Sequence, residues 1–349
     1  MAFARRWLFL PLMQLNKNIE KFINYFLAPL LLAWLLFFIY RQLLNQPNLA
    51  VSWLTIKRSL YSYNILYLIA SFLLMFVNWG LEAVKWKLSI ADVQRVSFLQ
   101  SFKAVLSGVS FTVTTPNRVG EYLGRILYLP SGKRLKTIPV TLIGSLSQIL
   151  ITFTFGCVSF ISLRSFLLQT QLITSTWHMF ISSGLSITMV IMTLLYFNVA
   201  GVMHNLLRWL RNSRYRYLFE GMRVFNQKLL MQLLLFSFAR YVTFMTQYFM
   251  LFKLYGVNIP VATLWMLMSL VFLVLAVIPT IVLAEIGLRG EITLQLVGLF
   301  TSNSLAIIAT SVTVWLINLI IPAIAGALFI LGVKVLKQNE RKGSSKVFL

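Results

Sequence analysis

TVTTPNRVGEYLGR, residues 112–125, interrupts one of the most apolar parts of this sequence. Three charged residues, one proline and two glycines follow the apolar run AVLSGVSF: Arg118, Glu121, Arg125, Pro116, Gly120 and Gly124. A proline ends a helix because it removes a backbone donor, and glycines let the chain turn or pack closely. Irregular backbone and charge at membrane depth are tolerated only where protein buries them or water reaches them. The stretch therefore predicts the tip and return of a re-entrant hairpin that opens to the cytoplasm.

The composition is that of a membrane protein. Hydrophobic residues make up 59% of the chain and charged residues 11%, and the mean hydropathy is +0.82. A soluble domain carries about 25% charged residues, so these values indicate a single transmembrane domain over residues 1–349. The only cysteine, Cys157, excludes a disulfide framework and a thiolate metal site. No metalloprotease, nucleotide-binding or serine-hydrolase motif is present, and we expect neither a cofactor nor a metal.

Six apolar runs are long enough to cross a membrane, for which about 20 apolar residues are needed. They are 22–40, 65–81, 138–163, 177–200, 229–251 and 304–333. Two further runs, 99–117 and 261–284, each end near a proline. We predict that both are re-entrant, although a full span remains the alternative for 261–284.

The formal net charge of +23 lies in the loops between these runs, which indicates membrane topology rather than nucleic-acid binding. If 99–137 and 261–303 dip in and return from opposite faces, 24 of the 31 Lys and Arg fall on one side. That side holds both termini and is cytoplasmic by the positive-inside rule. If the first segment crosses instead, the basic loops 117–137 and 201–228 fall outside. The basic loop 41–64 is the exception on the outer side.

The order of these segments repeats with opposite orientation, because each half reads span, span, hairpin, span. The half-repeats are 22–163 and 177–333, between an N-terminal segment 1–21 and a basic tail 334–349. Each hairpin places a proline before a Gly, Glu and Arg cluster, with Pro279 and Gly287 as the structural residues of the second. Paired interrupted segments in inverted halves point to a transport site near the midplane. The predicted fold is an all-α polytopic membrane protein with about six spans and two oppositely oriented re-entrant hairpins. The alternative to the paired hairpins is that two long helices are interrupted independently.

Arg240 lies near the middle of the run 229–251. An arginine at the centre of a span costs about 2.5–3.5 kcal/mol on insertion scales, so we expect it to have a partner. The candidate partners are a bound phosphate, Glu121, Glu285 and Glu291. Gln247 lies two helical turns after Arg240 and shares roughly its face. A purely structural ion pair is the alternative role for Arg240.

The stretch NWGLEAVKWK, residues 78–87, closes the second run. Glu82 and Lys85 are three residues apart and can pair on a helix. Trp79 and Trp86 suit the membrane interface. We therefore predict an interfacial anchor, with a catalytic Glu82 as the alternative.

Four stretches occur in order and are distributed over most of the chain: NWGLEAVKW (78–86), TPNRVGEYLGR (115–125), ARYVTFMTQY (239–248) and PTIVLAEIGLRGE (279–291). With them the chain resembles the transmembrane region of the lysylphosphatidylglycerol synthase/flippase family. The resemblance implies a polytopic inner-membrane protein that handles lipids, with flippase activity proposed for this region. In the full-length enzymes a soluble C-terminal domain transfers the aminoacyl group from tRNA. Here a short basic tail takes its place, so the resemblance implies a stand-alone member that does not make lysyl-lipid alone.

We predict a translocase for a lipid or lipid-linked substrate in the bacterial inner membrane, with no catalytic residue. The expected substrate-binding residues are Arg118, Glu121, Arg125, Arg240, Gln247, Glu285, Arg289 and Glu291. Guanidinium groups bind phosphate bidentately, and the glutamates would balance them or carry a proton. The expected partners are an anionic phospholipid or lipid-linked substrate and membrane lipids, with oligomerisation left open. The alternatives are a membrane-embedded transferase with Glu121 or Glu82 as base, and a non-catalytic scaffold of an envelope complex.

Overall fold

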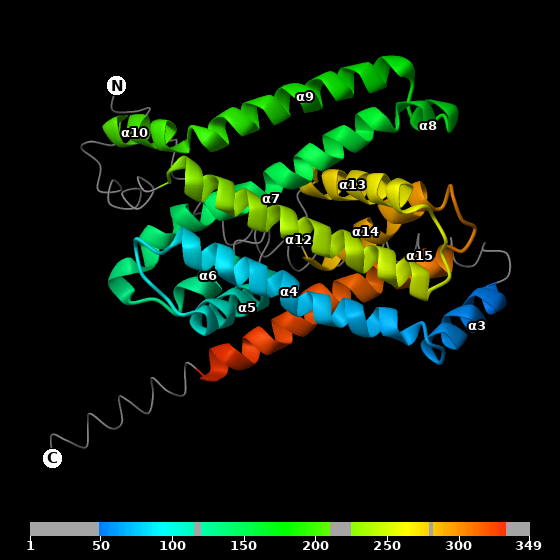
Figure 1. The fold of residues 1–349 in the computed structure, drawn as a ribbon, viewed down its shortest axis with the longest axis horizontal. Coiled ribbons are helices and arrows are strands. Elements are labelled where there is room, and N and C mark those ends of the chain that lie inside the picture. The colour runs from blue at the N-terminus through cyan, green and yellow to red at the C-terminus, as the bar shows by residue number, and fades with distance from the viewer. Residues whose placement is uncertain (1–48, 115–119, 210–224, 279–281, 333–349) are drawn as a thin grey trace, which may run out of the picture.

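The computed structural model describes residues 49–114, 120–209, 225–278 and 282–332, and within these ranges every regular element is a helix (Figure 1). The α-helices are α3 (Leu49–Leu60), α4 (Ile65–Ser89), α5 (Phe98–Thr114), α6 (Gly120–Ile126), α7 (Arg134–Ser162), α8 (Arg164–Gln169), α9 (Ser175–Phe197), α10 (Val199–Trp209), α12 (Gln227–Leu254), α13 (Val261–Val277), α14 (Val282–Val297) and α15 (Ser304–Trp315). A 3-10 turn, η4 (Ser131–Lys133), precedes α7, and a π-helical segment, η6 (Leu316–Ile320), continues α15. The predicted all-α polytopic membrane fold is confirmed.

Five of the described helices are long and apolar enough to cross a membrane. They are α4, α7, α9, α12 and the continuous helix Ser304–Gly332, which contains α15 and η6. They match five of the six predicted runs, and all five extend along the long axis of the molecule (Figure 1). The remaining run, 22–40, lies outside the described residues. Helix α3 falls within 41–64, for which the sequence predicts a loop.

Polar residues mark where three of the long helices begin. Thr174 caps α9 by accepting from the backbone N–H of Trp177. Asn226 caps α12 in the same way, and Asn303 caps α15. Each side chain satisfies a backbone donor that the first helical turn leaves without a partner. These caps fix the helix starts at positions where the apolar runs alone are ambiguous.

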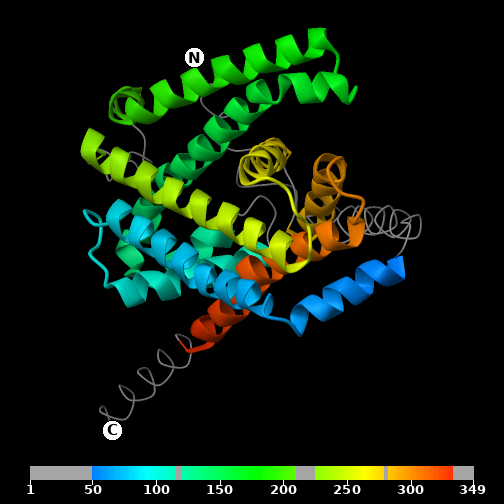
Figure 2. The same cartoon turned by 45° about the vertical axis from the view of Figure 1, so that its right-hand side comes forward.

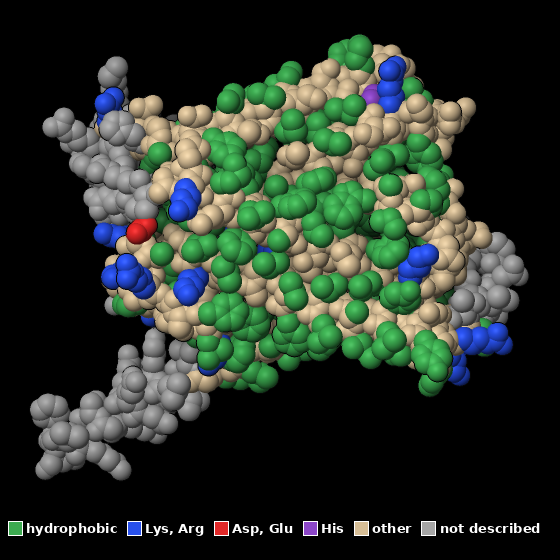
Figure 3. Space-filling model, viewed as in Figure 1, with side chains coloured by type: hydrophobic (Ala, Val, Ile, Leu, Met, Phe, Trp, Pro, Cys, Tyr) green, Lys and Arg blue, Asp and Glu red, His purple; other side chains and the backbone are tan. Residues whose placement is uncertain are grey.

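The long helices form neighbouring layers in the order α9, α7, α12 and α4 (Figure 2). Helix α9 packs mainly on α7, so most of its apolar side chains stay exposed. Hydrophobic side chains are spread over the broad middle of the visible surface, while Lys and Arg gather towards the two ends of the long axis (Figure 3). An apolar belt between two charged ends is what a bilayer requires of the protein it surrounds.

Two pairs of shorter helices lie among the long ones. Helices α5 and α6 pack together towards one end of the long axis, and α13 and α14 towards the other (Figure 1). Helix α6 has seven residues, far fewer than the roughly 20 needed to cross. Helix α13 ends at Val277 and α14 begins at Val282, so the run 261–284 is not one continuous helix.

The first pair is held together through its glycines. A Cβ on Gly124 of α6 would collide with the backbone of Ser107 and Gly108 of α5, and one on Gly108 would lie 2.7 Å from the Glu121 carbonyl oxygen. The two helices approach this closely only because both positions lack a side chain. A side chain at Gly124 or Gly108 would require the two helices to move apart.

Candidate functional site

One face of α4 is both polar and buried. Ser71, Asn78, Glu82, Lys85 and Ser89 all lie on it. Their spacing of three, four and seven residues places them on one side of a helix. From the first to the last the helix rises about 27 Å at 1.5 Å per residue, close to the roughly 30 Å of a hydrocarbon core. These polar residues, called the polar stripe below, therefore line this buried face over nearly the depth of a membrane, with Met75 between Ser71 and Asn78.

Glu82 is the centre of this stripe. Its Oε1 accepts a hydrogen bond from Arg125 Nη2 of α6 at 2.8 Å. Its Oε2 lies 3.0 Å from Lys85 Nζ and also accepts from Arg240 Nη1 of α12. Arg125 Nη2 donates to Glu121 as well. One carboxylate thus joins cations from three helices, and these five residues are called the Glu82 cluster below.

Arg240 is oriented by two further contacts. Its Nε donates to Asn78 Oδ1 at 3.0 Å. Its guanidinium carbon lies 5.6 Å from the centre of the Trp79 ring, within reach of a cation–π attraction. The side chain is therefore fixed against α4 by an ion pair, a hydrogen bond and an aromatic face.

Lys85 connects the cluster to α7. Its Nζ donates to Ser237 Oγ at 3.2 Å, and that hydroxyl lies 2.7 Å from Ser147 Oγ. Lys85 is 1% exposed, so its ammonium group is paired wholly inside the protein. A buried ammonium needs such partners because its desolvation is costly.

The Glu82 cluster carries more positive than negative charge, since its three cations face the two carboxylates of Glu82 and Glu121. Arg125 is 2% exposed, and its Nε has no hydrogen-bond partner in the part of the chain that the structure describes. A buried cation is stable only when it is paired. The cluster is therefore suited to one more anion, and guanidinium groups bind phosphate particularly well.

A chain of amides extends the polar stripe away from Glu82. Asn78 Nδ2 lies 3.4 Å from Asn318 Oδ1, and Asn318 Nδ2 donates to Gln247 Oε1 at 3.1 Å. Gln247 Nε2 in turn donates to the Ser71 carbonyl oxygen at 2.8 Å. This chain links α4, α12 and η6 and gives partners to buried amides that would be costly to leave unpaired.

Asn318 occupies the π-helical segment η6. Pro322, four residues later, has no N–H to donate to the Asn318 carbonyl oxygen. The wider turn is one way in which a helix accommodates such a loss, and single π turns recur at functional sites. The local sequence therefore explains why the helix departs from regular geometry at this asparagine.

A second charged group lies around Arg289 of α14. Its Nη2 donates to Glu285 Oε1 at 2.6 Å and its Nη1 to Tyr248 Oη at 3.0 Å. Its guanidinium carbon lies 5.8 Å from the centre of the Phe272 ring. Tyr248 follows Gln247 on α12, so this helix carries contacts of both charged groups.

The comparison with known proteins agrees with this architecture. A family model described as the lysylphosphatidylglycerol synthase TM region matches residues 25–326. The chain belongs to this family. No curated protein and no solved structure shows a significant match to it. The buried charged residues described above therefore lie in a membrane protein whose family is related to lipids.

The site residues predicted from the sequence are distributed over both charged groups of this family member. One connected network contains four of them: Glu121, Arg125, Arg240 and Gln247. They lie on two helices, α6 and α12, and the stretch from the first to the last is 127 residues long. Glu285 and Arg289 pair in the second group. Glu291 Oε1 accepts from Gln295 instead, at 2.8 Å.

The remaining predicted positions fall into two sets. Gly120 and Gly287 are buried in α6 and α14. Pro116, Arg118 and Pro279 lie outside the described residues.

Two sequence-based expectations for the charged residues were wrong. The described partner of Arg240 is Glu82, not Glu121, Glu285 or Glu291. The Glu82–Lys85 pair forms as predicted, but it is buried rather than anchored at the membrane interface. Trp86 is likewise 1% exposed and donates to Thr141 Oγ1 at 3.1 Å.

Asn78, Ser237 and Asn318 were missed as site residues. Each is a single polar residue within an apolar run, and Asn318 is followed by Pro322. An isolated polar side chain in a span has to find a partner inside the protein. This requirement could have identified the three residues from the sequence. Within the described ranges no three His, Cys, Asp or Glu side chains come close enough to hold a metal ion.

Proposed function

We propose that this protein moves an anionic lipid, or a lipid-linked substrate with an anionic head group, across the bacterial inner membrane. The observation that carries the proposal is the buried polar stripe of α4 with its excess of positive charge at Glu82. A head group that crosses a bilayer needs polar contacts along its whole path, because an unpaired polar group in hydrocarbon is costly.

The two helix pairs support a transport role. We propose that α5–α6 and α13–α14 are re-entrant hairpins that enter from opposite faces as parts of an inverted repeat over 22–163 and 177–333. They bring Arg125 and Arg289 into the interior. Opposed interrupted segments that carry charge are typical of transporter sites near the midplane.

The pairing of Glu82 favours transport over transferase chemistry. Both of its oxygens are engaged by cations, so it is poorly placed to accept a proton from a substrate. A general base needs a free oxygen within reach of that proton. Glu121 differs, because only its Oε1 is paired with a cation, Arg125, among the described residues.

The test is translocation of head-group-labelled phosphatidylglycerol in sealed phosphatidylcholine vesicles that contain the purified protein. We expect the protein to expose inner-leaflet label to an external reductant faster than empty vesicles do. Arg240→Ala should slow this at least about tenfold, because a charged hydrogen bond contributes about 1.5–3 kcal/mol. Arg240→Lys should recover only part of the rate, since lysine lacks the planar fork.

Lys228→Ala is the matched control, because it removes an exposed cation from the same helix. It should translocate like the unmodified protein. Label that moves no faster than in empty vesicles would contradict the proposal, as would an Arg240→Leu variant with full activity.

A further inference from the structure

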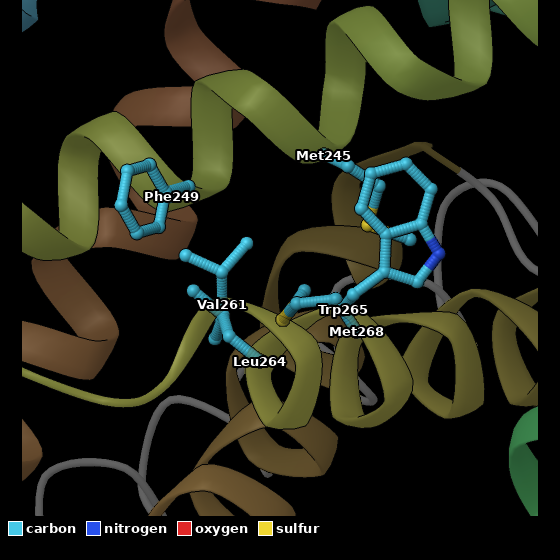
Figure 4. A pocket seen from close by; sticks show the side chains of 6 residues that line it. All are labelled: Met245, Phe249, Val261, Leu264, Trp265 and Met268. Atoms are coloured by element: carbon cyan, nitrogen blue, oxygen red, sulfur yellow. The ribbon is translucent and has the colours of Figure 1, made fainter.

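An apolar cavity of about 110 Å³ lies beside the Glu82 cluster. Its walls come from α4, α5 and the last part of the helix Ser304–Gly332: Met75, Phe76, Trp79, Phe102, Leu106 and Pro322. A closed apolar cavity of about 150 Å³ binds benzene, so this one has room for a short apolar segment. The gap between α12 and α13, lined by Met245, Phe249, Val261, Leu264, Trp265 and Met268, measures about 10 Å³ (Figure 4). It is too small for any ligand.

The cavity reaches the apolar surface of the protein. Phe76 is 49% exposed and Ile321 is 38% exposed, whereas Met75 and Leu106 are each 5% exposed. The exposed pair therefore belongs to the mouth and the buried pair to the inner wall. A mouth on the apolar belt opens towards lipid chains, not towards water.

Trp79 belongs to the cavity and the charge cluster at once. Its ring lines the cavity and also lies under the Arg240 guanidinium. Its Nε1 is buried and has no hydrogen-bond partner among the described residues. A buried indole N–H normally finds an acceptor. A ligand with an apolar chain and an oxygen at its end would fill the apolar cavity with the chain and give Trp79 Nε1 an acceptor with the oxygen.

We propose that this cavity binds the first methylenes of an acyl chain of an anionic phospholipid, with ester or phosphate oxygens near Trp79 Nε1 and Arg240. The proposal rests on the proposed function and adds the subsite at which the lipid enters. The neighbouring cluster favours an anionic head group because its cations outnumber its carboxylates.

The first test fills the cavity. Ala325 lines it, while Ala327 is exposed on the same helix, so Ala325→Phe and Ala327→Phe form a matched pair. Native mass spectrometry of the detergent-purified protein would measure retained phosphatidylglycerol. Ala325→Phe should retain about tenfold less, roughly the loss of two buried methylenes, and Ala327→Phe should retain as much as the unmodified protein. Equal retention by both variants would overturn the proposal.

The second test needs no variant and decides the matter if Ala325→Phe fails to fold. Phosphatidylglycerol with a diazirine near the ester end of one acyl chain would be cross-linked to the unmodified protein. Label on Phe102, Leu106 or Pro322 is expected, and label confined to other positions would refute the subsite. Both measurements report binding in detergent. An absence of translocation in vesicles would therefore remove the proposed function and leave the subsite standing.

Discussion

Glu82 shows how a single carboxylate can organise a membrane interior. It contacts Arg125, Lys85 and Arg240 from three helices, so its charge compensates groups that otherwise repel one another. Such an arrangement is sensitive to the loss of its centre, because removing one partner of a buried pair leaves the other charges uncompensated.

Glu82→Gln should therefore destabilise the protein more than any neighbouring substitution of similar size. The glutamine keeps the shape but leaves the cations facing only Glu121, and breaking a buried pair costs about 3–5 kcal/mol. Thermal unfolding of the detergent-purified variant would measure the loss. Asp92→Asn is the control, since Asp92 is exposed in the loop after α4. A Glu82→Gln protein as stable as Asp92→Asn would show that the cluster does not hold the fold together.

At the scale of elements, the α5–α6 pair depends on close backbone contact. Gly124→Ala should weaken it, because the new methyl group would meet the backbone of Gly108, and overpacking costs about 1–3 kcal/mol. Gly184→Ala is the matched control, since a Cβ at this position of α9 meets nothing within 4 Å. Thermal stability should fall for the first variant and stay level or rise for the second. Equal stability of the two would mean that α6 can move aside at little cost.

The elements also show what a sequence can and cannot specify. Apolar runs predict the long helices because crossing a bilayer requires length and hydrophobicity, which are local properties. The Pro and Gly residues of 112–125 predict an interruption of the helix, because their effect on the backbone is also a local property. The partner of Arg240 is a different matter, since Glu82 lies 158 positions earlier. That pairing depends on how α4 packs on α12, and side-chain chemistry alone leaves several glutamates equally suitable.

For the whole molecule, the arrangement of the helices predicts which loops share a side of the membrane. Helix α4 leads into the loop before α5, and α9 leads into the loop before α10, at the same end of the long axis (Figure 1). The loop between α14 and α15 lies at the other end. Exposed positions in these loops are Ser97, Asn198 and Ser302.

Single cysteines at these positions, in a Cys157→Ala background, should react with a membrane-impermeant maleimide from opposite sides. In intact cells Ser302→Cys should be labelled, while Ser97→Cys and Asn198→Cys should react only after the membrane is opened. Cys157 is buried and its removal should be harmless. Labelling of Ser302→Cys only from the inside would disprove the opposed hairpins.

The helix Ser304–Gly332 touches both helix pairs. Its first part packs on α14. Further along, Ser107 Oγ of α5 donates to the Gly326 carbonyl oxygen at 3.4 Å, and Ser110 Oγ donates to that of Ala323. Between these contacts lies η6, the segment that has π-helical instead of α-helical geometry. Helices bend most easily at such π turns. The helix therefore joins the two helix pairs in one continuous element, and its irregular turn at Asn318 lies between the two contacts.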